Sequence, residues 1–497
     1  MALSSDRLAL LRAVLADKGL ATPRTRVIPR RAARARAPLS FAQERLYFLE
    51  LYQPGTALYN DCVAVRIEGA LDPERLARAL AVVQARHEIL RTTFALAGDG
   101  PEQRVHEPGP PPLARLDLSD TSDAALRVRS LAAEEARTPF DLERQPPWRV
   151  LLARLGAADW LLVLTMHHIV SDGATMGLFF DELSAAYASG ASALAPLDLQ
   201  FGDSAAWERA TLDERRAEEH LTHWKRVLTE LPAYIWPASH GSASARGAWV
   251  PLGLGSQGVR RLEALARAEN ATSNQVLLAA WLVLLRIATG VDDQRTGIAS
   301  SLRQRRELEP LLGFFVQSLV LRADLGGDPA FGEIVRRVRA AGLEAQAHAE
   351  LPFDRIVRGV LAEQTVERTP RRASGPALTP TFFAHMQDAI RAPLFEGART
   401  AWEFVDAGAA RFELALVLHE SEHGLTGFLE YDLGVFAAET AERLAENYVR
   451  LLEAALARPE LHLSELGLLC APPAPARSQR APRAFPAPPR RAAGGSA

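Results

Sequence analysis

The stretch MHHIVSDG, residues 166–173, places two adjacent histidines, an aspartate and a glycine directly after the apolar run DWLLVLT at 159–165. The run predicts a buried strand, and the SDG sequence predicts the turn at which this strand ends. Because side chains alternate along a strand, His167 and His168 must face opposite ways. A buried imidazole costs free energy unless it is hydrogen-bonded. We therefore expect one imidazole to be fixed in the core and the other to point into a cleft.

The composition is that of a globular protein, with 497 residues, 48% hydrophobic residues and a formal net charge of -3. This length predicts two or three domains. The near-neutral charge gives no reason to expect a nucleic acid or an anionic membrane as the main partner. Only two cysteines occur, which excludes a disulfide scaffold, and no stretch reaches the ~18 apolar residues of a membrane span. The N-terminus lacks a signal-peptide pattern, so we expect a cytoplasmic protein. We also expect a monomer.

Composition and periodicity divide the chain into four segments. Residues 1–37 predict an amphipathic helix followed by an arginine-rich linker; a docking segment for an acidic partner surface is the alternative. Alternating strand and helix patterns over 38–229 and again over 230–470 predict an α/β (α+β) protein. The second set begins with a linker rich in Pro, Gly, Ser and Ala. The tail, 471–497, is rich in Pro, Arg and Ala and is predicted to be disordered.

Three patterns imitate metal or nucleotide sites but lack the necessary context. HESEH at 419–423 follows an alternating strand pattern and precedes a glycine, so it predicts a hairpin and not a zinc-binding helix. GLGSQG at 253–258 is followed by a long helix where a dinucleotide site would need a second strand. His220 and His223 predict a solvated helix face, because no third ligand is in view. We expect no bound metal.

Six segments, in order along the chain, resemble the successive motifs of the condensation domains of nonribosomal peptide synthetases. The match extends over about residues 38–470, and its six segments are LSFAQERLYFL (39–49), RHEILRTTF (86–94), MHHIVSDG (166–173), FGDSAAW (201–207), LLGFFVQSLVLR (311–322) and HAELPFDRIV (348–357).

The resemblance implies a fold, partners and no resident cofactor. Each half, 38–229 and 230–470, should resemble chloramphenicol acetyltransferase, and the two lobes should form a V-shaped pseudodimer with a central tunnel. Partner carrier proteins would insert their phosphopantetheine arms from opposite faces, one with a donor acyl thioester and one with an acceptor amine. The phosphopantetheine belongs to those partners, so no cofactor bound by the chain itself is expected.

The resemblance also implies roles for the residues of the third motif. His168 matches the catalytic position, and His167 would be turned inward as a structural residue. Asp172 would pair with an arginine from the second half, and the segment TGIASSLRQR makes that partner Arg303. Gly173 would lie where the tunnel narrows, although a turn that needs glycine would also account for it.

Two further residues match motif positions. Arg45, in the first motif, is interpreted as structural support for the site. Gln317, near the fifth motif, stands where the family usually has Asn. The longer amide can keep the same hydrogen bond but moves it by about one methylene, which affects substrate placement and not the fold.

The chemistry that fits is attack of an amine on a thioester, which gives an amide and a free thiol. Imidazole can take the proton at cellular pH, since its ordinary pKa is about 6.5. An α-amine titrates at roughly 7.7–8.0, so part of it is already neutral. Holding the reactants together can contribute about 7–11 kcal/mol, whereas a positioned base gives about 10²–10⁴-fold. We expect orientation to dominate, with His168 as base or as an anchor for the amine.

Three functions stay open at this stage. The first is amide-forming condensation on carrier-bound substrates, and the second is transfer of a carrier-bound acyl group to a soluble amine or alcohol. The third is a non-catalytic recruitment module with the same fold; the intact His168 and Gly173 argue against it. The first two share every motif. The starting Met1 favours a free-standing protein over an excised domain.

Overall fold

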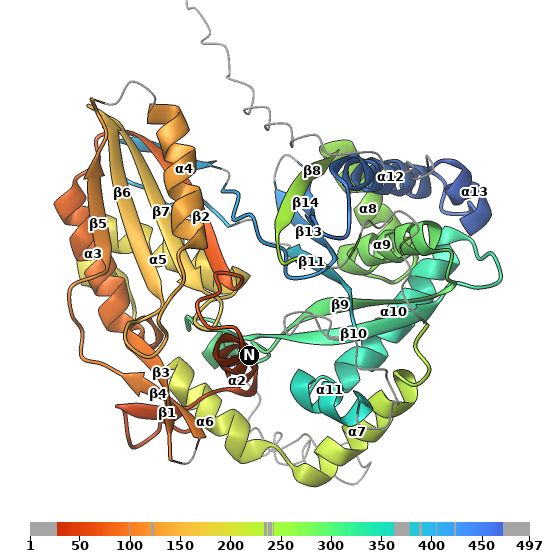
Figure 1. Cartoon of the computed structure of the whole chain (residues 1–497), viewed down its shortest axis with the longest axis horizontal. Helices are drawn as coiled ribbons and strands as arrows, with labels where there is room; N and C mark the ends of the chain where they lie inside the picture. Colours follow the sequence, from red (N-terminus) through yellow and green to blue (C-terminus); the bar gives the residue numbers. More distant parts are fainter. Residues whose placement is uncertain are drawn as a thin grey trace, which may run out of the picture.

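The structure, a computed structural model, has two lobes that lie side by side (Figure 1). It describes residues 27–470 apart from 99, 121–123, 233–235, 237–240, 242, 362–377, 387–389, 404 and 422–423. The helix predicted near the N-terminus and the predicted disordered tail lie outside the described residues.

The first lobe is built on a five-stranded sheet. Its strands, in sheet order, are β12 (Ala398–Glu403), β2 (Asn60–Gly69), β7 (Asp159–His167), β6 (Trp148–Gly156) and β5 (Leu113–Asp117). A small three-stranded sheet lies beside it, in the order β1 (Arg36–Pro38), β4 (Gly100–Val105) and β3 (Thr92–Ala97).

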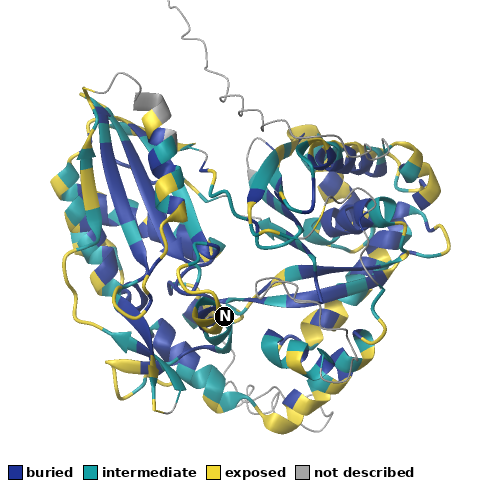
Figure 2. Cartoon of the chain, viewed as in Figure 1, coloured by how far each residue is buried: buried dark blue, intermediate teal, exposed yellow. Residues whose placement is uncertain are grey.

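Helices cover both faces of the five-stranded sheet. Leu162 and Leu164 of β7 pack with α3 (Pro73–Arg86) and α5 (Gly173–Ser189), whereas Leu161 and Val163 pack with α4 (Ala124–Arg137). A strand that is buried on both faces carries apolar side chains on both, which explains why the sequence of β7 is a nearly continuous apolar run. Figure 2 shows these central strands as buried along most of their length.

The second lobe has a six-stranded sheet in the order β10 (Val316–Asp324), β9 (Asp293–Ser301), β11 (Thr381–Met386), β13 (Leu414–Ser421), β14 (Gly424–Asp432) and β8 (Gly247–Gly255). One large core joins it to α8 (Ser256–Ala268), α9 (Ser273–Thr289), α10 (Phe331–Ala347), α12 (Ala438–Ala457) and α13 (Leu463–Leu468). A smaller core joins β10 to α7 (Glu214–Val227) and α11 (Phe353–Leu361). Short 3₁₀ turns are η1 (Glu88–Arg91), η2 (Gly190–Ala193) and η3 (Arg306–Leu308).

The two lobes exchange segments, so a single cut near residue 230 does not describe the arrangement. Helix α7 precedes that position in the chain but packs in the second lobe. Strand β12 comes late in the chain but pairs antiparallel with β2, at the edge of the first-lobe sheet. Two helices, α2 (Phe41–Tyr52) and α6 (Phe201–Thr211), lie between the lobes at their base (Figure 1).

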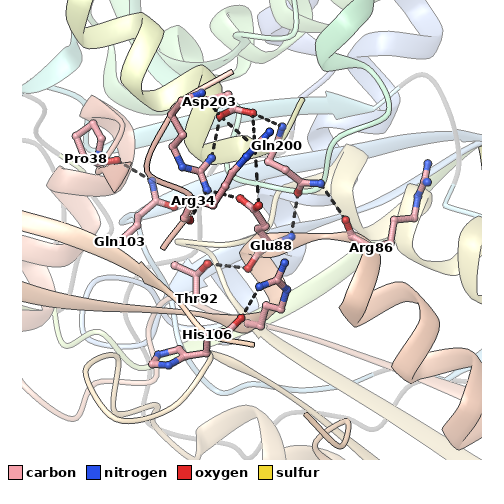
Figure 3. A network of polar contacts seen from close by, with 11 residues as sticks. Arg34, Pro38, Arg86, Glu88, Thr92, Gln103, His106, Gln200 and Asp203 are labelled. Carbon is pink, nitrogen blue, oxygen red and sulfur yellow. Dashed lines mark hydrogen bonds and ion pairs between the residues drawn. The ribbon is translucent and has the colours of Figure 1, made fainter. Parts of the chain in front are cut away.

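The arginine-rich segment is not a solvated linker where the structure describes it, which corrects the sequence interpretation. Ile28 is buried in the first-lobe core, and residues 36–38 form β1. The Arg31 Nη1 donates to Asp203 Oδ1 at 3.0 Å, and Arg34 Nη1 donates to Asp203 Oδ2 at 3.1 Å. Glu88 pairs with Arg31 in the same network, drawn in part in Figure 3. The segment folds back because the carboxylate of Asp203 is fully buried and requires cationic partners.

The pair His220 and His223 is covered, contrary to the predicted solvated face. The His223 ring stacks on His348 with 3.6 Å between ring centroids, and His220 Nδ1 lies 2.9 Å from His348 Nδ1. The reason is that α7 packs against the end of α10, which sequence periodicity does not show. The described residues contain no group of three or more side chains suited to a metal ion.

The hairpin predicted around HESEH is confirmed, since β13 and β14 are antiparallel neighbours on either side of residues 422–423. Taken singly, none of the described helices has both the length and the hydropathy to cross a membrane. Only α8 and α9 counted together reach those values, across a bend of 99°.

Candidate active site

The paired histidines lie at the end of β7, between the two lobes. The backbone N–H of His167 donates to Pro147 O at 2.9 Å, and that of His168 donates to Tyr59 O at 2.7 Å. These bonds hold the strand end against its neighbours β6 and β2, so the direction of each ring is fixed by the sheet.

His167 points into the core. Its Nδ1 accepts a hydrogen bond from the Ile169 N–H at 3.0 Å, and its ring lies beside Tyr59 and Phe140. Burial, together with the neighbouring His168, lowers the pKa of His167 to about 3. The ring is therefore neutral at pH 7 and serves the packing of the strand end.

His168 points the other way and lines a pocket between the lobes, with 21% of its side chain exposed. Its Nδ1 lies 2.7 Å from Asp61 Oδ2. The same carboxylate receives Arg411 Nη2 on Oδ1 at 2.5 Å and the Ser171 hydroxyl on Oδ2 at 3.2 Å. Phe314 covers one side of the imidazole, with 4.7 Å between ring centroids.

Asp61 is ionised in this setting. Burial raises the pKa of Asp61, but the charges and hydrogen bonds of His168 and Arg411 outweigh burial and hold that pKa well below its ordinary value. A carboxylate beside Nδ1 favours the tautomer that carries its proton on Nδ1. Nε2 of His168 is then the basic ring nitrogen.

Asp172 fixes the start of α5 and ties it to the second lobe. Its Oδ1 accepts from the Thr175 N–H at 2.7 Å, and its Oδ2 accepts from the Phe315 N–H at 2.9 Å. Arg303, the partner that the sequence resemblance names, donates to Asp172 Oδ1 from Nη2 at 3.2 Å. Its Nη1 donates to the carbonyls of Leu308 and Leu311 at 2.9 and 2.6 Å. Both charged side chains are buried.

Gly173 is the first residue of α5 and faces β11 of the second lobe. A Cβ built on Gly173 would lie 2.5 Å from Met386 Sδ, closer than two such atoms can approach. The lobes therefore meet closely here.

The pocket itself lies between the lobes, where the resemblance predicts a tunnel, and has a volume of about 100 Å³. Arg45 of α2 lines it and crosses to the second lobe, with its guanidinium 4.9 Å from the centre of the Phe353 ring. Gln317 lines the pocket from β10 and donates to the Ala349 carbonyl. Its amide is thus engaged with the neighbouring backbone.

The whole described region except its first six residues corresponds to one known domain type: the family model described as "Condensation domain" matches residues 33–472. The chain belongs to the condensation-domain family. The resemblance read from the six motifs is thereby confirmed.

Curated relatives of this condensation domain are large peptide synthetases. It is 34% identical over 448 residues to malpibaldin synthetase of Mortierella alpina, covering 88% of the chain but 8% of that protein. It is 35% identical over 443 residues to phosphinothricin tripeptide synthetase PhsC of Streptomyces viridochromogenes, covering 87% of the chain and 40% of that protein. The chain thus spans less than half the length of either of these relatives.

Solved structures confirm the predicted fold class. The X-domain from teicoplanin biosynthesis superposes with a TM-score of 0.76 and 30% identity, over 88% of this chain and 99% of that one. The first condensation domain of the calcium-dependent antibiotic synthetase superposes with a TM-score of 0.75 and 24% sequence identity. The match covers 87% of this chain and 98% of that one. The domain therefore has the chloramphenicol acetyltransferase-like, two-lobed fold of its family.

Two residues of the site escaped the sequence analysis. Asp61 lies in the N-terminal part of β2 and faces Met166 in register, one position from the His167 pair. Asp61 lies near His168 only because two strands about a hundred residues apart pair with each other. The one sequence signal for Asp61 is an acidic residue at the start of a predicted strand. Arg411 reaches Asp61 from the segment before β13, and no local pattern marks it.

Proposed function

We propose that this condensation domain forms an amide between an acyl or aminoacyl group, held as a thioester on a carrier protein, and an acceptor amine. Condensation domains as a family catalyse amide-bond formation, and the curated relatives are peptide synthetases. The observation that carries the proposal is the imidazole of His168, which lines the inter-lobe pocket with Nδ1 against Asp61.

In the proposed reaction the acceptor nitrogen attacks the thioester carbonyl carbon. The new C–N bond forms, the C–S bond breaks, and the carrier's phosphopantetheine thiol leaves. The proton lost by the amine passes to Nε2 of His168 and from there to the departing sulfur, so the imidazole is regenerated. The lobes contribute by holding both reactants at this imidazole, which is the larger of the two effects.

The test is reconstitution with an acyl-loaded carrier protein, offered either an aminoacyl-loaded carrier or free amines and alcohols, with products identified by mass spectrometry. We expect an amide from the wild type and a loss of about 10²–10⁴-fold in His168→Ala, the usual contribution of a positioned base. His106→Ala is the matched control, because His106 is exposed on the same lobe. Full turnover by His168→Ala would remove the catalytic role.

A second candidate, recruitment of a partner enzyme, is favoured by one comparison. A neighbour with 31% identity and a TM-score of 0.74 is the X-domain in complex with OxyB from teicoplanin biosynthesis. In the present chain the His168–Asp61 contact supports the catalytic proposal instead. Absence of any acyl transfer, combined with tight binding of a modifying enzyme to the loaded carrier complex, would favour recruitment.

A further inference from the structure

One carboxylate that lines the pocket has no part in the reaction proposed above. Glu208 extends from α6 into the wall of the cavity that His168 also lines. Most of the surrounding wall is apolar, with Leu302, Phe314 and Phe382 among its members. A carboxylate in such a wall is costly unless something compensates it.

The basic side chains of the wall each lie against a carboxylate. Arg411 and His168 both lie against Asp61, and the Arg45 Nε lies 3.9 Å from Asp354 Oδ1.

Glu208 differs from these groups. Its Oε2 accepts from the Phe41 N–H at 3.3 Å, at the first turn of α2. The adjacent Arg209 is engaged elsewhere, on the Leu39 carbonyl at 2.6 Å and on Glu44. Among the residues that the structure describes, none forms an ion pair with Glu208.

The ionisation of Glu208 is poised near neutrality. Burial raises the pKa of Glu208 to about 7, against smaller opposing effects of the Phe41 N–H and the Arg209 charge. A cation that enters the pocket would stabilise the ionised form and would be bound more tightly in return. The titratable or charged groups that share this wall are Arg45, Tyr59, His168, Asp354 and Arg411, and Arg209 adjoins Glu208 on α6.

We propose that Glu208 binds an ammonium group of the substrate and so determines which amines the pocket accepts. The inference rests on the proposed function and deepens it. The acceptor amine of the proposed reaction supplies such a cation in its protonated form, since an α-amine titrates at roughly 7.7–8.0. The ammonium can be the α-amine of the acceptor before its deprotonation, or an amine on the side chain of a loaded amino acid. The chemistry at Glu208 is the same for both.

A conservative substitution separates a purely structural role of Glu208 from binding of an ammonium group. Glu208→Gln keeps an oxygen that accepts from the Phe41 N–H and removes only the charge. Glu218→Gln is the matched control, because Glu218 is exposed on α7, outside the pocket.

The experiment measures binding at pH 7.5 by calorimetry, with four stable amide analogues of acyl-pantetheine. The ornithyl analogue carries both amines, the norvalyl analogue only the α-amine, the 5-aminopentanoyl analogue only the terminal amine, and the pentanoyl analogue neither. We expect wild type and Glu218→Gln to bind an amine-bearing analogue about tenfold more tightly than pentanoyl, and Glu208→Gln to lose that preference. The amine that binds Glu208 is the one, α or terminal, whose analogue loses its tighter binding in Glu208→Gln.

Two results overturn the inference: a wild type without preference for either amine, or a preference that Glu208→Gln retains while the variant is folded at the assay temperature. Neither depends on turnover. Failure of the proposed function is distinguishable, because it shows as absence of amide product from the wild type while the binding preference persists.

Discussion

At the residue scale, Asp61 decides which nitrogen of His168 is free to take a proton. Its Oδ2 lies 2.7 Å from Nδ1, and a carboxylate this close favours the tautomer that carries its proton on Nδ1. Asp61→Asn keeps the shape of the side chain but removes the charge that favours this tautomer. We expect kcat for amide formation to fall about 10²-fold, within the range of general-base contributions, measured by mass spectrometry under single-turnover conditions.

Asp159→Asn is the matched control for Asp61→Asn. Asp159 lies at the other end of the same pair of strands and is also paired with an arginine, Arg66. Its replacement should leave kcat unchanged. A melting curve confirms that the variants are folded at the assay temperature, and equal rates for Asp61→Asn and wild type would contradict the orienting role.

Glu208 makes a second prediction, on stability. Its pKa is raised in the folded protein to about 7 from an ordinary 4.5, so the folded state holds a proton that the unfolded state releases between these values. Stability of the wild type therefore decreases as pH rises through this window. Glu208→Gln lacks this loss. We expect the variant to match wild type at pH 5 and to exceed it by on the order of 2 kcal/mol at pH 8, in urea denaturation.

The opposite trend, with the variant losing stability relative to wild type as pH rises, would show that the ionised carboxylate is compensated in the folded protein. Glu218→Gln should show no pH-dependent difference, because its side chain is exposed in the folded state.

Part of this site could be predicted from the sequence because His167, His168, Asp172 and Gly173 all lie in one motif, residues 166–173. The opposite directions of His167 and His168 follow from strand alternation alone. Asp61 and Arg411 are contributed by remote segments, and their importance arises only when β2 pairs with β7 and the lobes close on each other. Pairing between distant segments leaves no local periodicity to read.

At the scale of elements, the position of α5 makes Gly173 critical for space and not for backbone conformation. A Cβ there would meet Met386 Sδ at 2.5 Å, and a flexible methionine can yield to a methyl group but not to a branched side chain. We expect Gly173→Ala to lower kcat/KM several-fold and Gly173→Val to lower it by more than about 10²-fold, since small misplacements at a reaction centre are that costly.

Gly177→Ala is the control on the same helix, because a Cβ at Gly177 meets nothing within 4 Å. It should leave kcat/KM unchanged and stabilise the helix by up to about 1 kcal/mol. Partial rescue of Gly173→Val by Met386→Ala would identify the clash as the cause, and equal kcat/KM for Gly173→Val and wild type would exclude it.

The arginine-rich segment gives an element-scale prediction of stability. Arg31 is buried and serves both Asp203 and Glu88, so Arg31→Ala leaves buried carboxylates with only Arg34 as a partner. We expect a loss of about 3 kcal/mol in urea denaturation. Arg30→Ala is the control, because the Arg30 pair with Asp198 is exposed and such pairs contribute about 0–1 kcal/mol. Equal effects of the two changes would mean that the segment is not anchored.

Local patterns were reliable for elements whose partners are close in sequence. The hairpin predicted around HESEH is such a case, because β13 and β14 follow one another in the chain and pair antiparallel. Strand β12 and the docking of α7 were missed, because each pairs with an element remote in sequence. Hydrophobic periodicity shows that one face of an element is buried, but it does not show which element packs against that face.

At the scale of the whole molecule, His168 is flanked by two ion pairs that each join the lobes. Asp61 in the first lobe binds Arg411, and Asp172 binds Arg303 of the second lobe. The geometry of the candidate site is therefore linked to the arrangement of the lobes, since a change in their separation alters both pairs at once. The sequence resemblance anticipated the Arg303 pair, whereas the Arg411 pair emerges only from the closed fold.

The Asp172–Arg303 pair is accordingly the place to test this linkage. Asp172→Ala leaves the buried guanidinium of Arg303 without its carboxylate and removes the cap of α5, so we expect a loss of about 3–5 kcal/mol in urea denaturation. A double-mutant cycle with Arg303→Ala should give a coupling of about 0.5–3 kcal/mol. The Glu68–Arg399 pair, which also joins distant parts of the chain but is exposed, should give less than about 1 kcal/mol. Equal coupling in the two cycles would show that burial between the lobes adds nothing to the Asp172–Arg303 pair.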